Sequence, residues 1–186
     1  MFELMLALDL RDELSAGELA ELRWHLGVGP QPDTVRIVTE FPVVVEDEDG
    51  EFVIEDHPEP LLGQQGGGYK VGGALVSVLL RLQDAGQEGW ALTSRQEIHP
   101  DDFERAGELL SWLAAKASER HRGSDGDVHL GWIRFYEEPW PAPLVVRDGA
   151  VVWPSWIRVR AVRWCDGGGD RGTDRGLAAR GGGSDR

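Results

Sequence analysis

The chain has 186 residues, of which 41% are hydrophobic and 28% are charged, and this is enough to bury the core of one globular domain with an appendage. Its net charge of −14 argues against general nucleic-acid binding and against anionic membrane surfaces, because both need cations to neutralise phosphate groups. The single cysteine, Cys165, excludes an intrachain disulfide and a thiolate metal cluster.

Arginine outnumbers lysine by 17 to 2 and asparagine is absent, a bias that indicates GC-rich coding in a bacterium and carries no information on function. The N-terminus carries Glu3 and Asp9 but no basic leader. No window approaches the roughly 20 apolar residues of a membrane helix. We therefore expect a cytoplasmic protein.

A strand followed by a short helix is predicted at the start of the chain. Residues 2–10 alternate so that Leu4, Leu6, Leu8 and Leu10 share one face. Ser15 and Glu18 match a capping box at the helix start, and Gly27 is placed to end the helix. The apolar stripe of this helix is predicted on Leu19, Leu22 and Leu26.

An acidic hairpin is predicted next. Residues 35–46 and 51–55 flank Asp49-Gly50, a pair that favours a tight primed turn. From Ile37 to Tyr69 the chain has nine Asp or Glu and no Lys or Arg. Such a run is typical of a solvated face, or of an acidic surface that docks a basic protein. The candidate partner-binding residues are Asp47, Glu48, Asp49, Glu51, Glu55 and Asp56.

Residues 56–73 are expected to form a glycine-rich linker. The run from Gly63 to Lys70 is similar to a phosphate-binding loop, but Val71 replaces the hydroxyl residue and a strand is predicted to follow instead of a helix. Without a helix N-terminus the run lacks much of the physical basis of an anion site, so we predict a flexible linker.

The second half repeats the order of strand and helix. Strands are predicted at 74–83 and 90–98, and a helix at 100–122 begins with Pro100 in the first helical position. A further strand at 128–136 is expected to be bulged at Gly131, and a second hairpin turns at Asp148-Gly149. The core-facing side of the second helix is predicted on Phe103, Ala106, Leu110, Leu113 and Ala117.

The C-terminal part of the chain has two predicted regions. Residues 154–165 are an uncertain extension, because 151–164 fits either a last strand or a loosely packed apolar segment. Residues 166–186 contain four Asp, four Arg and almost no large apolar side chain, so they are expected to be disordered.

A weak internal sequence repeat indicates a duplicated unit. Residues 7–22 align without gaps with residues 91–106, and Ala7, Leu8, Arg11 and Glu13 recur as Ala91, Leu92, Arg95 and Glu97. We predict an α+β fold over residues 1–153. It is expected to be a ferredoxin-like sandwich variant built from a duplicated β-α-β unit, with repeat units at about 2–55 and 75–137 and extra hairpins. Both helices would cover one face of an antiparallel sheet, with strands 2–10 and 90–98 as central neighbours.

The uncovered sheet face offers candidate ligand-binding residues. Pseudo-symmetry would bring two Arg-x-Glu sets together there, and guanidinium groups match carboxylates and phosphates. The alternatives are ion pairing between strands and pairing of this face with another subunit as a homodimer. The candidates are Arg11, Glu13, Arg95, Glu97 and His129.

Nothing in the sequence marks a catalytic centre, a metal site or a cofactor. The five histidines lack metal-ligand spacing, and no nucleophile motif occurs. The leading hypothesis is a non-enzymatic acidic protein that docks a basic protein partner, such as a regulator, an adaptor or a toxin-neutralising protein. The alternative is a small-molecule-binding protein or enzyme of the dimeric α+β-barrel kind, with its site on the open sheet face.

Overall fold

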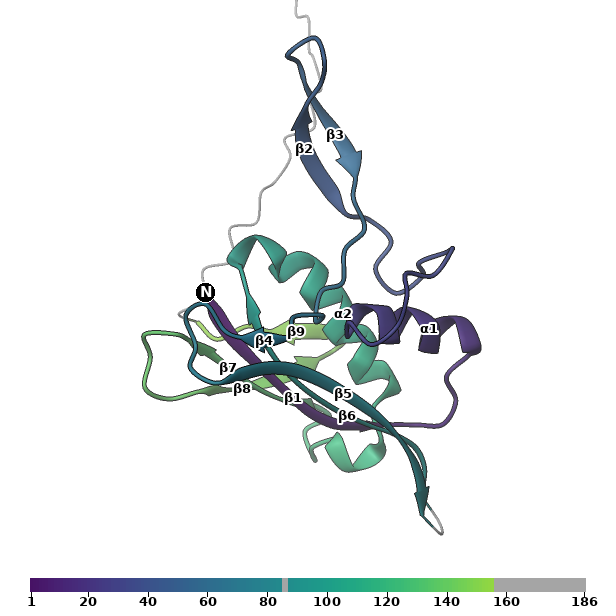
Figure 1. The fold of residues 1–186 in the computed structure, drawn as a ribbon. Helices are drawn as coiled ribbons and strands as arrows, with labels where there is room; N and C mark the ends of the chain where they lie inside the picture. Colours follow the sequence, from purple (N-terminus) through teal and green to yellow (C-terminus); the bar gives the residue numbers. More distant parts are fainter. Residues whose placement is uncertain (85–86, 156–186) are drawn as a thin grey trace, which may run out of the picture.

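The computed structural model describes residues 1–84 and 87–155, which form an α+β fold around an antiparallel sheet (Figure 1). Within these residues the sheet has seven strands, and β1 lies at its centre. Every neighbouring pair is antiparallel. The strands follow the spatial order β4 (Gly66–Gly67), β5 (Ala74–Asp84), β6 (Gln87–Ile98), β1 (Phe2–Leu10), β7 (Val128–Phe135), β8 (Ala142–Arg147) and β9 (Ala150–Val152).

The predicted pairing of the strands at 2–10 and 90–98 is confirmed. β1 and β6 are antiparallel neighbours, with Leu6 opposite Ser94 and Leu10 opposite Trp90. β7 lies on the other side of β1, so both central strands are protected from edge exposure. The predicted bulge at Gly131 is also present, because the register shifts between His129 and Gly131. Gly131 has φ +150°, and a Cβ there would lie 1.9 Å from the Met5 carbonyl oxygen, so only glycine fits.

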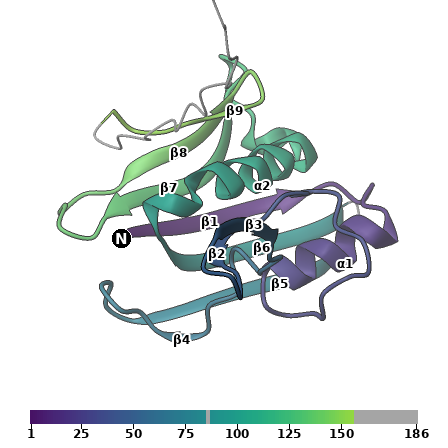
Figure 2. The ribbon, with the colours of Figure 1, turned by 90° about the horizontal axis from the view of Figure 1, so that it is seen from above.

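Two helices, α1 (Ala16–His25) and α2 (Phe103–Lys116), cover the same face of the sheet (Figures 1 and 2). The capping box at Ser15 and Glu18 forms as predicted. Glu18 also binds the Lys116 ammonium at 2.6 Å, and this contact, with those to Ser15, lowers the pKa of Glu18 to about 2. The start of α1 is thereby tied to the end of α2.

The second helix is shorter than predicted. Single 3-10 turns at Pro100–Asp102 and Glu119–His121 flank α2, which ends at Lys116. Ala117 is extended, with φ −62° and ψ 146°, and forms an isolated bridge with Leu10. The Ser118 amide donates to the Asp9 carbonyl at 2.8 Å, so pairing with the end of β1 replaces the last helical turns.

The core lies between the helices and the sheet. All four leucines predicted on one face of β1 are buried, and so is the predicted apolar side of α2. Burial of each leucine or phenylalanine in this layer contributes about 2 kcal/mol, so the layer supplies most of the driving force for the fold. At the end of α1, Gly27 adopts φ +66°, and a Cβ there would lie 2.7 Å from the Gly63 oxygen. Glycine is therefore required both to end α1 and to let the later loop pass.

The acidic hairpin is a separate two-stranded ribbon, β2 (Pro42–Glu46) and β3 (Phe52–Asp56), that projects from the body (Figure 1). We call residues 42–56 the arm. It is shorter than predicted, because residues 35–41 form no strand. Its turn is also not the predicted primed type, since Gly50 has φ +80° but Asp49 does not have positive φ. Instead, the Asp47 carboxylate accepts the amides of Asp49 and Glu51 at 2.9 Å each.

The second predicted hairpin joins β8 and β9, with positive φ at both Asp148 and Gly149 as a primed turn requires. Among the described residues, no helix is both long enough and apolar enough to cross a membrane. The predicted extension after Ser155 and the predicted disordered tail, 166–186, lie outside the described residues.

Candidate functional site

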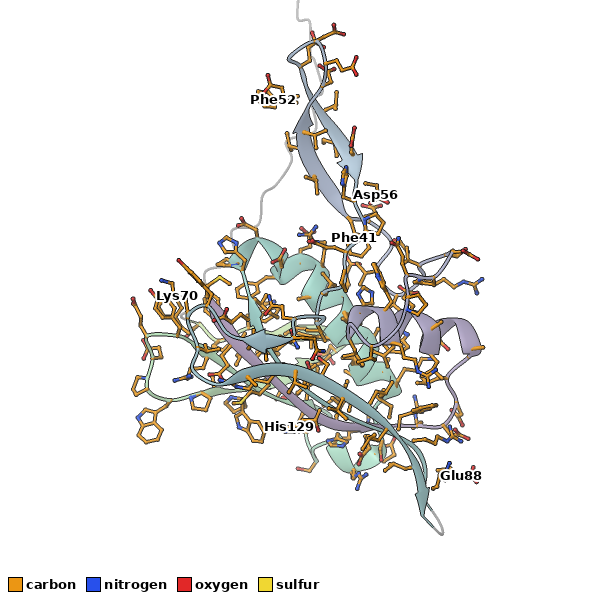
Figure 3. All side chains as sticks on the ribbon, in the orientation of Figure 1. Phe41, Phe52, Asp56, Lys70, Glu88 and His129 are labelled. Carbon is orange, nitrogen blue, oxygen red and sulfur yellow. The ribbon has the colours of Figure 1, made fainter. Side chains whose placement is uncertain are left out.

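The arm carries an exposed apolar strip on one of its two faces. Cross-strand partners share a face, and the register pairs Val44 with Ile54 and Glu46 with Phe52. Phe52 is 77% exposed, and Val44 and Ile54 are each 60% exposed. Figure 3 shows Phe52 far out on the arm, with Phe41 and Asp56 at its root. Three large apolar side chains therefore face solvent on this face of the ribbon, and Val43, on the opposite face, is exposed as well.

Acidic groups surround this strip. The arm contains no Lys or Arg, and its acidic residues are Glu46, Asp47, Glu48, Asp49, Glu51, Glu55 and Asp56. The strip thus combines apolar surface with a strongly negative field, which would be complementary to an apolar site with a basic rim. All six predicted partner-binding residues belong to the arm. Three have local partners, since Asp47 shapes the turn, Asp56 accepts the Phe41 amide at 2.6 Å, and a Glu55 oxygen lies 2.7 Å from His57 Nε2.

The root of the arm is anchored in the core. Phe41 is fully buried, and its ring lies 6.0 Å from the Trp24 ring and 6.3 Å from the His25 ring. The His57 amide donates to the Phe41 carbonyl at 2.9 Å, which closes the ribbon where it meets the body. The arm therefore leaves the body from a fixed point on α1, although its outer part has no support.

Two buried polar residues of α1 bind the chain on either side of the arm. We call residues 36–38 its entering leg and residues 61–62 its leaving leg. The Glu21 carboxylate accepts the amides of Arg36, Ile37 and Val38 at 2.6, 2.7 and 3.2 Å, and so fixes the entering leg. On the leaving leg, the Leu62 amide donates to the His25 carbonyl at 2.8 Å. A carboxylate that accepts several amides is a strong local anchor, because each bond is charge-assisted.

His25 is held in its neutral form by burial, which lowers its pKa to about 4. Its Nδ1 accepts the Leu61 amide at 3.5 Å, while its Nε2 is buried without a hydrogen-bond partner and lies 3.7 Å from a Glu21 oxygen. Protonation of the ring would place a charge inside the core at the root of the arm. The leg-holding arrangement is therefore suited to neutral pH.

The glycine-rich loop encloses one of the chain's own carboxylates. Glu97 accepts the amides of Tyr69, Lys70 and Val71 at 2.7, 2.5 and 2.7 Å. Burial opposes ionisation of Glu97, but these amide bonds dominate and lower its pKa. The three amides that resembled an anion site are thus already satisfied from within the chain.

Arg95 is engaged in a network across the central strands. Its guanidinium contacts the Glu3 carboxylate, with Nε at 2.7 Å, and donates to the carbonyls of Gly72 and Ala74 at 2.7 and 2.9 Å. Glu3 is buried, and its carboxylate also accepts a hydrogen bond from Arg134 Nε of β7 at 2.8 Å. Arg95 therefore closes the loop before β5 and neutralises a buried carboxylate.

The two Arg-x-Glu sets do not meet. β1 and β6 are antiparallel, so the residues after Leu10 lie beside the start of β6, whereas Arg95 lies opposite Met5. Arg11 instead donates to the Ala115 carbonyl at 2.5 Å, at the end of α2. Arg11 and Glu13 border a hollow of about 440 Å³ whose other lining residues are Asp9, Leu10, Asp12, Leu82, Glu88, Ser118 and Arg120.

His129 (Figure 3) lies on β7, where it pairs with Val145 of β8, and its side chain is exposed. The nearby His121 is half-buried, accepts the Asp9 amide at 2.9 Å, and has a pKa lowered by burial and by the charge of Arg120. Within the described ranges, no group of three or more His, Cys, Asp or Glu is placed to hold a metal ion.

The sheet face opposite the helices, which we call the open face, is partly apolar. Val76, Val78 and Leu80 of β5 and Trp132 of β7 are exposed large side chains, and the register assigns them to the same face as Met5 and Arg95. Their exposure makes the open face the main competitor of the arm as an interaction surface.

Comparison of the chain with protein-family models, with curated proteins and with solved structures finds no match in any of the three.

The sequence predicts the acidic residues of the arm but not the exposure of its apolar residues. An alternating run such as Val43–Val45 or Phe52–Ile54 is also typical of a strand that is half-buried in a sheet. The available signal was the absence of any covering helix for this hairpin in the predicted order. The sequence analysis also did not identify Glu21 and His25. They are four residues apart and directly precede Leu22 and Leu26, so helical spacing places them beside the buried side of α1.

Proposed function

We propose that this chain is a protein-binding module whose arm docks a basic partner protein. One observation carries the proposal: the exposed apolar strip of Val44, Phe52 and Ile54 lies on a ribbon with seven acidic residues and no basic one. The partner would present an apolar groove for the strip and Lys or Arg on its rim. Such a module acts by binding, as a regulator, adaptor or toxin-neutralising protein does.

The energetics of the arm support this proposal. A two-stranded ribbon is only marginally stable in water, and aromatic side chains are costly to leave exposed. Both features are tolerable where a surface is built to be covered. Phe52 is the natural anchor, since interface energy concentrates in a few large side chains within desolvated pockets. The acidic residues would raise the association rate and select against acidic partners.

The polar groups of the open face are less suited to ligand recognition. The Arg95 guanidinium binds Glu3 and loop carbonyls, and the Glu97 carboxylate binds loop amides. These two groups are therefore already engaged within the chain. A small-molecule function is therefore the second candidate, and the observation that favours it is the hollow that Arg11 and Glu13 border.

A quantitative capture experiment tests the proposal. The wild-type chain, the arm variant V44T/F52S/I54T and the open-face variant V78T/L80T are used as baits, and bound proteins are compared by mass spectrometry. We expect a basic protein that wild type and the open-face variant retain equally and that the arm variant loses at least tenfold. Its capture should also weaken as salt rises, because exposed charges are screened.

Two outcomes contradict the proposal. Equal capture by the arm variant would place the interaction elsewhere. Loss of capture by V78T/L80T alone would assign binding to the open face. Circular dichroism of both variants controls for folding, and all five substituted side chains are exposed, so neither variant should perturb the core.

We also propose that the body is a ferredoxin-like sandwich variant that arose by duplication of a β-α-β unit. Support comes from the strand order β5-β6-β1-β7, from the position of one helix after β1 and one after β6, and from the sequence repeat between residues 7–22 and 91–106. In this view the arm and the glycine-rich segment are insertions between α1 and β5.

A further inference from the structure

The strand β5 has a long unpaired edge. Of its eleven residues only Ala74 and Leu75 pair with β4, so the other residues pair with β6 on one side and with no described strand on the other. β5 lies along one side of the sheet (Figure 2). The opposite edge of the sheet is β9, which has three residues. Long free edges readily pair with a further strand, and proteins usually keep their edges short for this reason.

The backbone pattern of β5 identifies which groups on this edge are free. The Gly68 amide donates to the Gly73 carbonyl, so Leu75, two residues further along, also directs its amide and carbonyl toward β4. Because these groups alternate along a strand, the later residues that point theirs the same way are Ser77, Leu79, Arg81 and Gln83. Among the described residues, no group binds the backbone amides or carbonyls of these four residues.

The side chains along this edge carry no negative charge. Residues 74–83 contain no Asp, Glu, Lys or Pro, although the chain has 33 acidic residues. The one charged side chain, Arg81, is paired with Asp12 of the same chain. Edges that are protected from pairing usually carry charges or Pro, and β5 lacks this protection. A second copy of this chain, which the net charge of −14 would repel elsewhere, can therefore approach along β5.

The free edge is symmetric about Leu80. Pairing with β4 ends at Leu75 and β5 itself ends at Asp84, so the free stretch is 76–84 and Leu80 is its midpoint. Two antiparallel copies with Leu80 opposite Leu80 therefore pair over the whole free stretch. In this register the β4 strand of each copy lies beyond the end of the other copy's β5, so neither blocks the pairing.

The same register matches both backbone and side chains. It places Ser77 opposite Gln83 of the second copy, and Leu79 opposite Arg81, so residues with outward-pointing groups meet each other. Four such pairs form along the edge, and each exchanges two hydrogen bonds. On the open face, Leu80, which is 60% exposed, meets its own copy. Apolar side chains that lie opposite each other on one face stabilise a strand pair.

We propose that two copies of this chain pair along the free edge of β5, antiparallel and about a two-fold axis at Leu80, and join their sheets into one continuous sheet. A two-fold pairing uses the free edge of both copies, so the assembly closes as a dimer. The axis is perpendicular to the sheet, and both helix layers therefore lie on one side. Both arms would project from that side and could bind a partner twice; this consequence alone rests on the proposed function.

Disulfide trapping tests the register. Each variant also carries Cys165→Ser, so that the introduced cysteine is the single thiol. Leu80→Cys should give a covalent dimer on mild oxidation, because opposed residues of a non-hydrogen-bonded antiparallel pair have Cα atoms about 4.5 Å apart, within disulfide range. The matched control is Thr93→Cys, exposed on the same face but on β6. Three strand spacings, roughly 14 Å, would separate its two copies, so it should cross-link at least tenfold less.

Charges at the axis test the dimer in solution by analytical ultracentrifugation. The wild type should sediment as a dimer. Leu80→Lys and Leu80→Glu each place like charges opposite each other, so each should dimerise at least tenfold more weakly. An equal mixture of the two variants should restore the dimer, because opposite charges then meet. Thr93→Glu adds the same charge one strand away from the edge and should dimerise as wild type does.

Four outcomes overturn the proposal: a monomeric wild type, equal cross-linking of the two cysteine variants, no restoration in the mixture, or dissociation by Thr93→Glu as strong as by Leu80→Glu. The last outcome would assign the dimer to packing of two open faces. Circular dichroism controls for folding, and both substituted side chains are exposed. None of these measurements uses a partner of the arm, so their failure is distinguishable from failure of the proposed function.

Discussion

Buried carboxylates organise the loops of this protein. Glu21 and Glu97 each accept three consecutive backbone amides, one set before the arm and the other after it. Loops without regular structure must satisfy their amides in some way, and one ionised side chain here does so for three at once. Both residues are structural anchors.

Glu97→Gln should destabilise the fold by about 2 kcal/mol, because the amide loses the charge that strengthens three hydrogen bonds and aims an N–H₂ group toward other donors. Urea denaturation measures the loss. The control is Glu88→Gln, near the start of β6 on the far side of the body from the arm (Figure 3), which should change stability by less than about 0.5 kcal/mol. Equal effects of the two substitutions would contradict the anchoring role.

The lowered pKa of Glu97 also has a pH consequence. The stability that its ionised form contributes is fully present above its ordinary pKa of 4.5 and is lost as the pH falls through the lower, folded-state pKa. The difference in unfolding free energy between wild type and Glu97→Gln should therefore shrink as the pH falls below 4.5. A difference that stays constant or grows in acid would contradict this assignment.

His25→Leu should flatten the stability profile between pH 6.5 and 4. The pKa of His25 is lowered to about 4 in the folded state, so in this window the unfolded chain binds more protons and the wild type loses stability as the pH falls. Leucine removes the titrating ring and the unpaired Nε2. Thermal unfolding at several pH values measures the effect, and parallel profiles for the two proteins would rule it out.

At this scale the sequence predicted residue chemistry better than residue partners. Ser15, Glu18 and Gly131 behave as predicted, because each role depends on neighbours within a few residues or on a backbone conformation that only glycine adopts. The contacts of Arg95 with Glu3 and of Glu97 with loop amides were not predicted, because these partners lie far away in sequence. No local pattern encodes such contacts.

At the scale of elements, the protein combines a packed body with an unsupported ribbon. Both helices and the strands of the sheet other than β4 were predictable, since alternation and helical spacing reflect burial against one face. β4 falls within the predicted linker. The errors fell where tertiary contacts replaced local preference. Within the predicted strand 35–41, the amides of residues 36–38 bind Glu21 instead of a neighbouring strand. The chain after Lys116 pairs with the end of β1 instead of continuing as helix.

Leu110→Ala should lower the stability of the protein strongly, whereas Phe52→Ser should hardly change it. Leu110 is buried between α2 and the sheet, so its truncation should cost 2–5 kcal/mol, as large-to-small core changes do. Phe52 is 77% exposed, so Phe52→Ser should leave the unfolding of the body within about 0.5 kcal/mol of wild type. Chemical denaturation followed by tryptophan fluorescence compares them. A large loss from Phe52→Ser would mean that the arm belongs to the core.

At the scale of the molecule, charge and shape are unevenly distributed. In the body, several carboxylates are paired with arginines, such as Glu3 with Arg134 and Asp127 with Arg147, whereas the arm has seven carboxylates and no Lys or Arg. The net charge of −14 is therefore not only a matter of solubility, since a large share of it lies on one projecting element.

The most direct test of the arm as a docking element is hydrogen exchange of the full chain, alone and with its captured basic partner. We predict that amides of residues 42–56 exchange more slowly in the complex, while those of β5 and β7 at the open face are unchanged. Slower exchange confined to β5 and β7, with the arm unaffected, would contradict the account.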